Sequence, residues 1–387
     1  RLVGSEMCIR DRNGFVPLSN FSGTFNGNGK TLTIGYRGDA QQIGLFKRLS
    51  GTVRNLTVAG RFESVRSDDS EIHLGAFAAE TDNAAIENCT NRAEIVVADA
   101  ADVTPRTMIL SGFVGKAFNG VTLRNCRNTG NISFSSPALY MIGGFVGAVQ
   151  EDDGLYTIAD CHNTADFDNA GSNSGWNFMG GIAGKTISRQ LVPGETSNYR
   201  LIVEECSSTG TISIAGPSKV RASGIVAQTQ GAYRISGCTF SGAIESTDAT
   251  KRDVVIGGIM AMADKECVGL VEGCTFSGRI SAAQAGANNF FGGIYGNNGG
   301  AASVVNDCRT TASAYVGCPI GKSVGMLAGR PNKKGFTVSN CRIAGTVTNK
   351  QGAAVVITAD NLEDWMFAGY GTSVAVTLKN NGYNDGK

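Results

Sequence analysis

The most reactive side chains of this sequence are its 11 cysteines, eight of which recur at intervals of 32 to 45 residues. No two are spaced as C-x-x-C, the arrangement common in zinc sites and redox pairs. Stacked in parallel they would lie about 4.8 Å apart, within disulfide reach, but with parallel side-chain vectors that strain the bond. We expect free, buried thiols acting as small apolar residues. The eight are Cys89, Cys126, Cys161, Cys206, Cys238, Cys274, Cys308 and Cys341.

Other groups capable of chemistry are few and scattered. Cys267 and Cys318 lie outside the series and are expected to be exposed thiols, and the only histidines are His73 and His162. Parallel β-solenoids that cleave polysaccharides need clustered carboxylates, a calcium cage or an Arg or Lys base on adjacent turns. The sequence shows no such cluster. We therefore predict no catalytic residue, no metal site and no cofactor, and keep a polysaccharide lyase or glycoside hydrolase as the alternative.

The elements that must position these residues follow the period of the cysteines. An aliphatic residue stands three positions before each cysteine of the series, and Gly or Ala stands four positions after it. The position directly before the cysteine holds Asn, Asp, Glu or Gly, mostly residues that favour a bend. The same columns extend backward to Leu56, which occupies the cysteine position. Nine repeats are therefore in register.

A second motif, such as Gly143-Gly144-Phe145-Val146-Gly147, precedes each cysteine segment. The chain contains 53 glycines, and each interior Gly costs a helix roughly 1 kcal/mol relative to Ala. Short apolar runs separated by turns instead indicate strands, and such repeats bury their apolar faces only by stacking. We predict an all-β fold, a right-handed parallel β-helix (β-solenoid) of about nine to ten coils of roughly 35 residues, with three short strands per coil.

The chain divides into three segments. Residues 2–12 match the in-frame translation of a common transposase sequencing adapter, so residues 1–12 are interpreted as an artefact and not as native sequence. Residues 13–350 form the predicted parallel β-helix domain. Residues 351–387 depart from the repeat and are predicted to be a C-terminal cap or the start of a truncated region.

Strand alternation predicts an exposed apolar stripe beside the glycine motif. If Phe145 and its equivalents point inward, their neighbours point outward, and a flat apolar face of this kind marks an interaction surface. The alternative is that longer loops, such as residues 187–199, fold over it. Tyr140, Trp176 and Phe290 are predicted to add aromatic contacts beside the stripe. The stripe itself is represented by Val114, Val146, Val226, Met260 and Tyr295.

Charge and hydropathy exclude two classes of partner. The chain has 34 basic and 33 acidic residues, a formal net charge of +1, so it lacks the basic field that nucleic-acid binding requires. No apolar run approaches the ~20 residues of a membrane-spanning helix. We expect no nucleic-acid partner and no integral membrane domain.

The segments Asn125–Ile132 and Gly143–Gly147 resemble the GLUG-repeat proteins of bacterial surfaces, especially those of gut Bacteroidetes. The stretch Phe21–Ile34 is similar to the entry coil that such proteins often carry. The resemblance covers residues 21–347 and implies an exported, surface-attached protein of adhesin-like function. It further implies that the partners are glycans or surface proteins of the host or of other bacteria, or that the rod is a spacer. The missing catalytic clusters, and not the resemblance, predict that it is non-catalytic.

Overall fold

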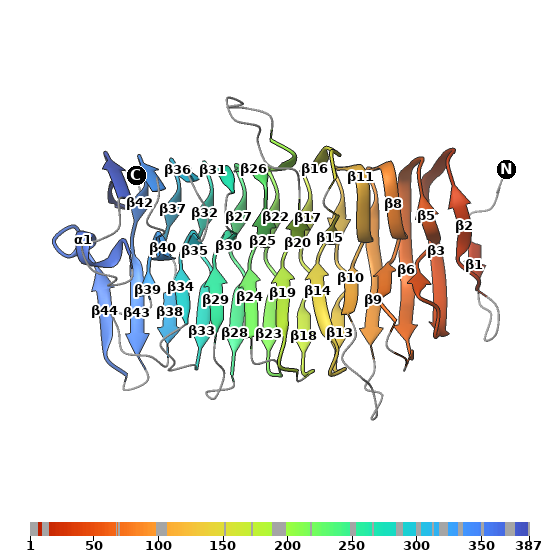
Figure 1. The fold of residues 1–387 in the computed structure, drawn as a ribbon, viewed down its shortest axis with the longest axis horizontal. Helices are drawn as coiled ribbons and strands as arrows, with labels where there is room; N and C mark the ends of the chain where they lie inside the picture. Colours follow the sequence, from red (N-terminus) through yellow and green to blue (C-terminus); the bar gives the residue numbers. More distant parts are fainter. Residues whose placement is uncertain are drawn as a thin grey trace.

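The computed structural model shows a rod in which successive turns of a β-solenoid stack from the N-terminal to the C-terminal end (Figure 1). Below, a turn means one such turn of the solenoid. It describes residues 7–9, 15–66, 68, 70–97, 107–150, 152–171, 173–187, 199–216, 219–247, 253–264, 267–283, 289–298, 303–311, 313–316, 324–331, 336–349, 352–367 and 376–385. A sheet of nine parallel strands holds one strand from each successive turn. The nine are β4 (Gln42–Ile43), β7 (Ile72–Gly75), β10 (Thr107–Ser111), β14 (Leu139–Gly143), β19 (Trp176–Gly180), β24 (Lys219–Ser223), β29 (Val254–Gly257), β34 (Phe290–Gly292) and β39 (Val324–Gly325).

The predicted parallel β-solenoid is confirmed, with a finer division of each turn than expected. A representative turn has five short strand segments in place of three, because the chain bends between the apolar runs and also within them. Each segment pairs in parallel with its equivalents in the turns on either side, as Val146 does with Val114 and Ala183. The five segments are β14, β15 (Val146–Val149), β16 (Tyr156–Ala159), β17 (His162–Asn163) and β18 (Phe167–Asn169).

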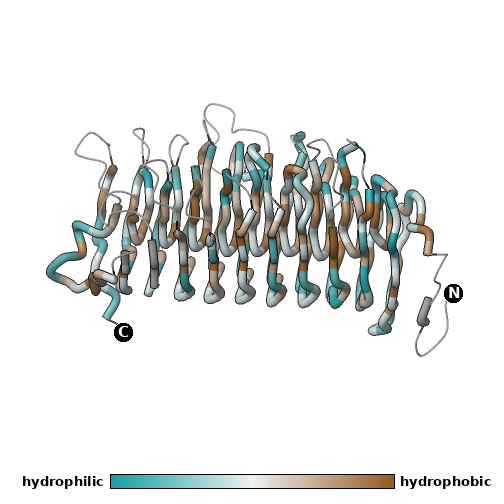
Figure 2. Tube along the Cα trace, turned by 90° about the horizontal axis from the view of Figure 1, so that it is seen from below, coloured by the Kyte–Doolittle hydropathy of each residue, from teal (hydrophilic) through white to brown (hydrophobic). Residues whose placement is uncertain are grey.

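The core consists of columns of like residues stacked along the rod. Hydrophobic positions recur at similar places in successive turns (Figure 2). In one column the Phe77 and Phe113 rings stack at 4.6 Å between centroids, and those of Phe113 and Phe145 stack at 4.8 Å. Stacking identical side chains fills the interior with complementary shapes, which is how a chain with short strands reaches dense packing.

The cysteine column lies at an inner corner, and the bend before it is confirmed. The preceding residue adopts positive φ, for example 51° at Asn125 and 61° at Gly273, a conformation that Asn, Asp and Gly tolerate best. The Cys126 thiol then donates to the Arg124 carbonyl oxygen at 3.3 Å. The eight cysteines of the series and Cys267 are all free and buried. The expectation for Cys267 is therefore wrong, since its side chain is fully buried, and Cys318 falls outside the described residues.

Beside the cysteines, one interior column is polar over four turns. The Asn91 amide donates to Asn128 at 2.8 Å, and the Asn128 amide donates to Asn163 at 2.8 Å. Asn163 in turn donates to the Ser208 hydroxyl at 3.3 Å. All four side chains are buried, so this amide ladder satisfies polar groups that would otherwise be costly inside the core. The column continues with the stacked rings of Phe240 and Phe276.

The predicted exposed stripe is wrong, because its residues form another interior column. The chain bends at Gly144-Phe145, between β14 and β15, and alternation does not carry through that bend. Phe145 and the residue after it therefore both face the core. Residues 188–198, most of the loop expected to cover the stripe, lie outside the described part of the chain. The five residues predicted to form the stripe have no exposed surface: Val114, Val146, Val226, Met260 and Tyr295.

Residues 352–385 both interrupt and resume the repeat. Strand β44 (Ala354–Ile357) pairs antiparallel with β43 (Gly345–Asn349), and the side chains of helix α1 (Leu362–Trp365) pack against the last turns. Strand β45 (Val376–Lys379) then pairs in parallel with β41 (Phe336–Ser339). The expected departure from the repeat therefore applies to β44 and α1 but not to β45.

At the other end, strand β1 (Met7–Ile9) pairs in parallel with Leu32–Ile34 of β3 (Thr24–Gly38). An open sheet edge accepts backbone pairing from almost any extended segment. The adapter origin of residues 1–12 therefore remains a prediction. No helix in the described ranges is long and apolar enough to cross a bilayer.

Candidate functional site

The sharp bend between the nine-stranded sheet and the following strand creates an elbow along the rod. One arm of the elbow is the solvent-facing side of the nine-stranded sheet, and the other is the solvent-facing side of the strands that follow it in each turn. The two arms lie close together. A Cβ added at Gly147 would lie 2.8 Å from Cγ2 of Ile109 in the preceding turn, and one added at Gly184 would lie 2.8 Å from the Ile142 carbonyl oxygen. Close approach of the two arms therefore restricts the last position of the repeated motif to small residues, glycine in most turns and alanine at Ala79, Ala227 and Ala261.

Side chains seven positions apart meet across the elbow. His73 contacts Glu80, Lys185 lies over Phe178, and Arg221 donates to Gln228. This spacing follows from the bend, since it brings the outward residue of one strand against the outward residue of the next. On the sheet side the column is Gln42, His73, Ile109, Met141, Phe178, Arg221, Val255 and Phe290, and on the other side it is Arg48, Glu80, Lys116, Ala148, Lys185, Gln228, Met262, Asn297 and Arg330.

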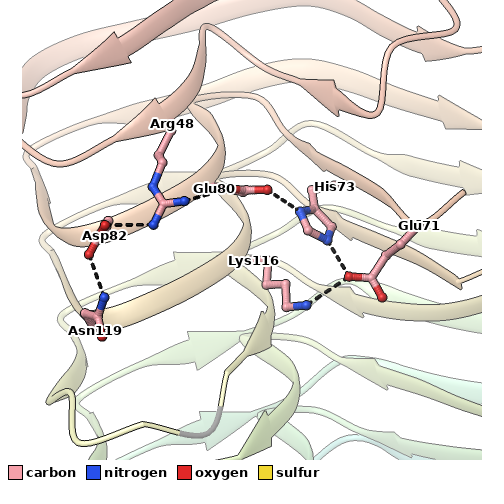
Figure 3. A network of polar contacts seen from close by, with 7 residues as sticks. All are labelled: Arg48, Glu71, His73, Glu80, Asp82, Lys116 and Asn119. Atoms are coloured by element: carbon pink, nitrogen blue, oxygen red, sulfur yellow. Dashed lines mark hydrogen bonds and ion pairs between the residues drawn. The ribbon is translucent and has the colours of Figure 1, made fainter.

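The N-terminal part of the elbow holds a charged network centred on His73 (Figure 3). Its Nδ1 lies 2.9 Å from Oε1 of Glu80, and its Nε2 lies 2.6 Å from Oε1 of Glu71. Lys116 Nζ, from the next turn, donates to the same Glu71 oxygen at 2.9 Å. The imidazole is thus held between two carboxylates, one of which also binds a lysine.

The network continues from Glu80 into the preceding turn. Arg48 Nη1 lies 3.4 Å from Oε2 of Glu80, and Arg48 Nη2 donates to Oδ2 of Asp82 at 2.7 Å. The Asn119 amide donates to Asp82 at 2.8 Å. Each of the two permanent cations, Arg48 and Lys116, therefore has a carboxylate partner (Figure 3).

Electrostatics favour the charged form of the groups in this network. Burial disfavours the charged imidazole of His73, but its hydrogen bonds to Glu71 and Glu80 outweigh burial and raise its pKa. The hydrogen bond from His73 lowers the pKa of Glu71 to about 2. In the protonated imidazole both ring nitrogens donate, so neither is open to accept a proton.

The central part of the elbow holds a cluster of aromatic rings and cations. The Arg221 guanidinium lies 4.2 Å from the centre of the Trp176 ring and 5.6 Å from that of Phe178. Lys219 Nζ lies 5.9 Å from the Trp176 ring, and Lys185 Nζ lies 5.3 Å from that of Phe178. These distances allow cation–π attraction. We call these five residues the central cluster.

Burial acts against the charges of this cluster. It lowers the pKa of Arg221 to about 10, and together with the nearby Arg221 charge it lowers the pKa of Lys185. The nearest acidic group in the elbow is Asp264, whose Oδ2 accepts hydrogen bonds from Gln228 at 2.9 Å and from Gln230 at 2.6 Å. The guanidinium Nε of Arg221 is buried without a hydrogen-bond partner.

The three aromatic residues proposed from sequence have different surroundings. Trp176 is half-buried in the central cluster. Phe290 lies in the elbow but is 3% exposed, beneath Arg330 at 5.2 Å from its ring centre. Tyr140 faces the core, where its hydroxyl contacts the Asn169 amide. Of the three, Trp176 is the one with an accessible ring, and the other two predictions of surface contact are wrong.

Sequence reasoning missed the charged network and the cations of the central cluster. Their acids and bases occupy single turns, so no column of like charges marks them. The available signal was the seven-residue spacing across the glycine motif, seen in His73 with Glu80 and in Phe178 with Lys185. Using it requires knowing that the bend turns the two strands' outward faces toward each other.

A polar depression lies over the bend column, away from the residues of the elbow. It is lined by acidic, amide and basic side chains around Arg124, which pairs with Asp160 at 3.5 Å. Both side chains are about half exposed, so the pair contributes little to stability. Across the described part of the chain, no group of three or more His, Cys, Asp or Glu side chains is placed to bind a metal. The lining residues are Glu87, Asn88, Arg124, Asn125, Asp160 and His162.

Comparisons with known proteins leave the argument to the geometry. No protein-family model, no curated protein and no solved structure matches this chain.

Proposed function

We propose that the protein is an exported bacterial surface protein of the GLUG-repeat type that binds glycans without cleaving them, through the central cluster of the elbow. The observation that carries the proposal is the half-buried Trp176 ring beside Lys219 and Arg221. An aromatic face with a few fixed polar groups is the usual composition of small-molecule binding sites. Export and surface attachment rest on the resemblance of the repeats.

The rod supplies the rigidity that such a site needs. Trp176, Lys219 and Arg221 lie on β19 and β24, which pair in register with strands on both sides. Sites on paired strands hold their side chains more accurately than sites on loops. The two columns of the elbow also continue past the cluster in both directions along the axis of the rod.

The test is binding of the full chain to immobilised or soluble polysaccharides, both neutral and acidic, measured by affinity electrophoresis and calorimetry. We expect retention without release of new chain ends. Trp176→Ala should weaken binding by up to about tenfold, since a stacked aromatic contact is worth about 0.5–1.5 kcal/mol. Tyr36→Ala, a half-buried aromatic on β3, is the matched control and should bind normally. Absence of binding to every polysaccharide contradicts the proposal.

A second candidate function is polysaccharide cleavage at the charged network. The observation that favours it is the assembly of acids and bases from three successive turns, including Glu80, His73 and Lys116, in one part of the elbow. Its test is the release of unsaturated or reducing ends from the same polysaccharides. Release that disappears in Glu80→Gln but persists in the exposed control Glu94→Gln would establish an enzyme and displace the binding proposal.

A further inference from the structure

The central cluster has more positive than negative charge. Lys185, Lys219 and Arg221 bring three cations, against one carboxylate in the elbow, Asp264, and one at its margin, Asp253. None of the three cations forms an ion pair with a carboxylate among the described residues. Their neighbours are the faces of Trp176 and Phe178, which attract a cation but leave its charge unneutralised.

Two of the cations, Arg221 and Lys185, are also poorly solvated. Arg221 is half-buried, one of its amino groups donates to Gln228, and its Nε has no hydrogen-bond partner in the described structure. A partly buried charge without a counterion is unfavourable. Burial depresses the pKa values of Arg221 and Lys185 accordingly. An anion at this position would reverse the penalty and complete the hydrogen bonding of the guanidinium.

In the charged network, by contrast, the cations of the elbow are paired with carboxylates of the protein itself. Lys116 occupies the same column as Lys185, two turns earlier, and is neutralised by Glu71 at 2.9 Å. Arg48 likewise has Glu80 and Asp82. The fold can therefore place a carboxylate against a cation in this column, and the central cluster places an aromatic ring there.

We propose that the central cluster binds the anionic group of an acidic polysaccharide, a carboxylate or a sulfate ester, between Arg221, Lys185 and Lys219, with the sugar ring against Trp176. This inference rests on the proposed function and adds its ligand class. Arg221 is the anchor, because a guanidinium binds carboxylate and sulfate oxygens with two parallel hydrogen bonds. The lysines add charge without that geometry.

The experiment titrates the full chain with polygalacturonate, heparin and the neutral polymer dextran at low and at physiological salt, with calorimetric detection. We expect binding of at least one acidic polymer at least tenfold more tightly than of dextran, weakened by salt. Arg221→Gln and Lys185→Gln should each reduce that affinity about tenfold, as loss of a charged hydrogen bond does. Arg127→Gln, an exposed cation on β12 (Arg127–Asn128), is the matched control. Comparing the two acidic polymers distinguishes carboxylate from sulfate recognition.

Other results overturn the inference in distinguishable ways. Equal affinity for dextran and the acidic polymers overturns the anion site and leaves glycan binding intact. Acidic binding that Arg127→Gln weakens as much as Arg221→Gln does shows nonspecific attraction and also overturns it. Failure of every polymer to bind removes the proposed function together with the inference. Circular dichroism of each variant ensures that a lost fold is not read as lost binding.

Discussion

At the N-terminal end of the elbow, Lys116 donates to the Glu71 carboxylate at 2.9 Å, whereas two turns further along the same column Lys185 lies 5.3 Å from the centre of the Phe178 ring. The backbone is the same in both places. What differs is the set of partners, the carboxylates Glu71 and Glu80 around His73 in one region and aromatic rings in the other. One region neutralises its own charges, and the other keeps them available.

If the proposed function holds, this comparison places a stabilising region and a binding region in different turns of one repeat architecture. The backbone and the inward columns are shared by every turn, so the outward residues of single turns can change without altering the fold. The charged network serves the stack by joining three turns. The central cluster accepts a cost in burial and is therefore the better candidate for a ligand.

The largest expected effect on stability comes from forcing the two arms of the elbow apart between the charged network and the central cluster. Gly147→Val places a side chain where even a Cβ would be 2.8 Å from Ile109, and we expect destabilisation of about 3 kcal/mol from overpacking. Urea unfolding measures it. Gly35→Ala, where an added Cβ has no neighbour within 4 Å, is the control. A variant as stable as wild type would show that the elbow is not a close contact.

Removing one carboxylate should disturb the charged network alone. Glu80→Gln leaves His73 and Arg48 with a neutral partner, and we expect a loss of about 2 kcal/mol, the cost of breaking partly buried charged hydrogen bonds. Glu94→Gln breaks an exposed pair with Arg61 and should cost less than about 0.5 kcal/mol. Equal effects in urea unfolding would place the network among ordinary surface pairs.

The sharpest comparison exchanges one arginine in each region for methionine. Arg48→Met should destabilise by about 1–2 kcal/mol, because Glu80 and Asp82 lose their cation. Arg221→Met should change the free energy of unfolding by less than about 1 kcal/mol in either direction, since lost cation–π attraction is offset by removal of an unpaired charge. A large loss in Arg221→Met would mean that Arg221 is structural.

The smallest expected effect is on pH dependence. The raised pKa of His73 gives stability that is complete below its ordinary value of 6.5 and is lost as pH rises through the folded value. The lowered pKa of Glu71 gives stability that is complete above 4.5 and is lost as pH falls toward about 2. The network should therefore stabilise most between pH 4.5 and 6.5. Thermal unfolding of His73→Gln should lack the decline in stability that the wild type shows as pH rises above 6.5, while Arg221→Gln should leave that decline unchanged.

Much of the fold could be predicted from sequence because its signals repeat. The cysteine period, the bend residue before each cysteine and the aliphatic columns each recur many times, so chance agreement is small. Free, buried thiols followed from the same argument, since parallel side chains in one column do not reach the geometry of a disulfide.

The elbow could not be predicted in the same way, for a physical reason. Alternation assigns inward and outward faces only while a strand continues. The bend at Gly144-Phe145 separates β14 from β15 and changes the direction of the chain, so the alternation starts again at Val146. That bend moved Val146 and Tyr295 into the core and brought His73 against Glu80. Functional residues that occur in one turn only leave no column to read.

The buried amide ladder of Asn91, Asn128 and Asn163 has one more consequence. Because all turns are alike in shape, a growing stack could pair each turn with the wrong neighbour. If the turn of Asn163 paired with the turn after next, the Asn163 amide would face apolar Phe240 in place of Ser208. A buried hydrogen-bond donor would then be left unsatisfied. The ladder therefore specifies the order in which otherwise similar turns stack, much as a single buried asparagine fixes the register of a coiled coil.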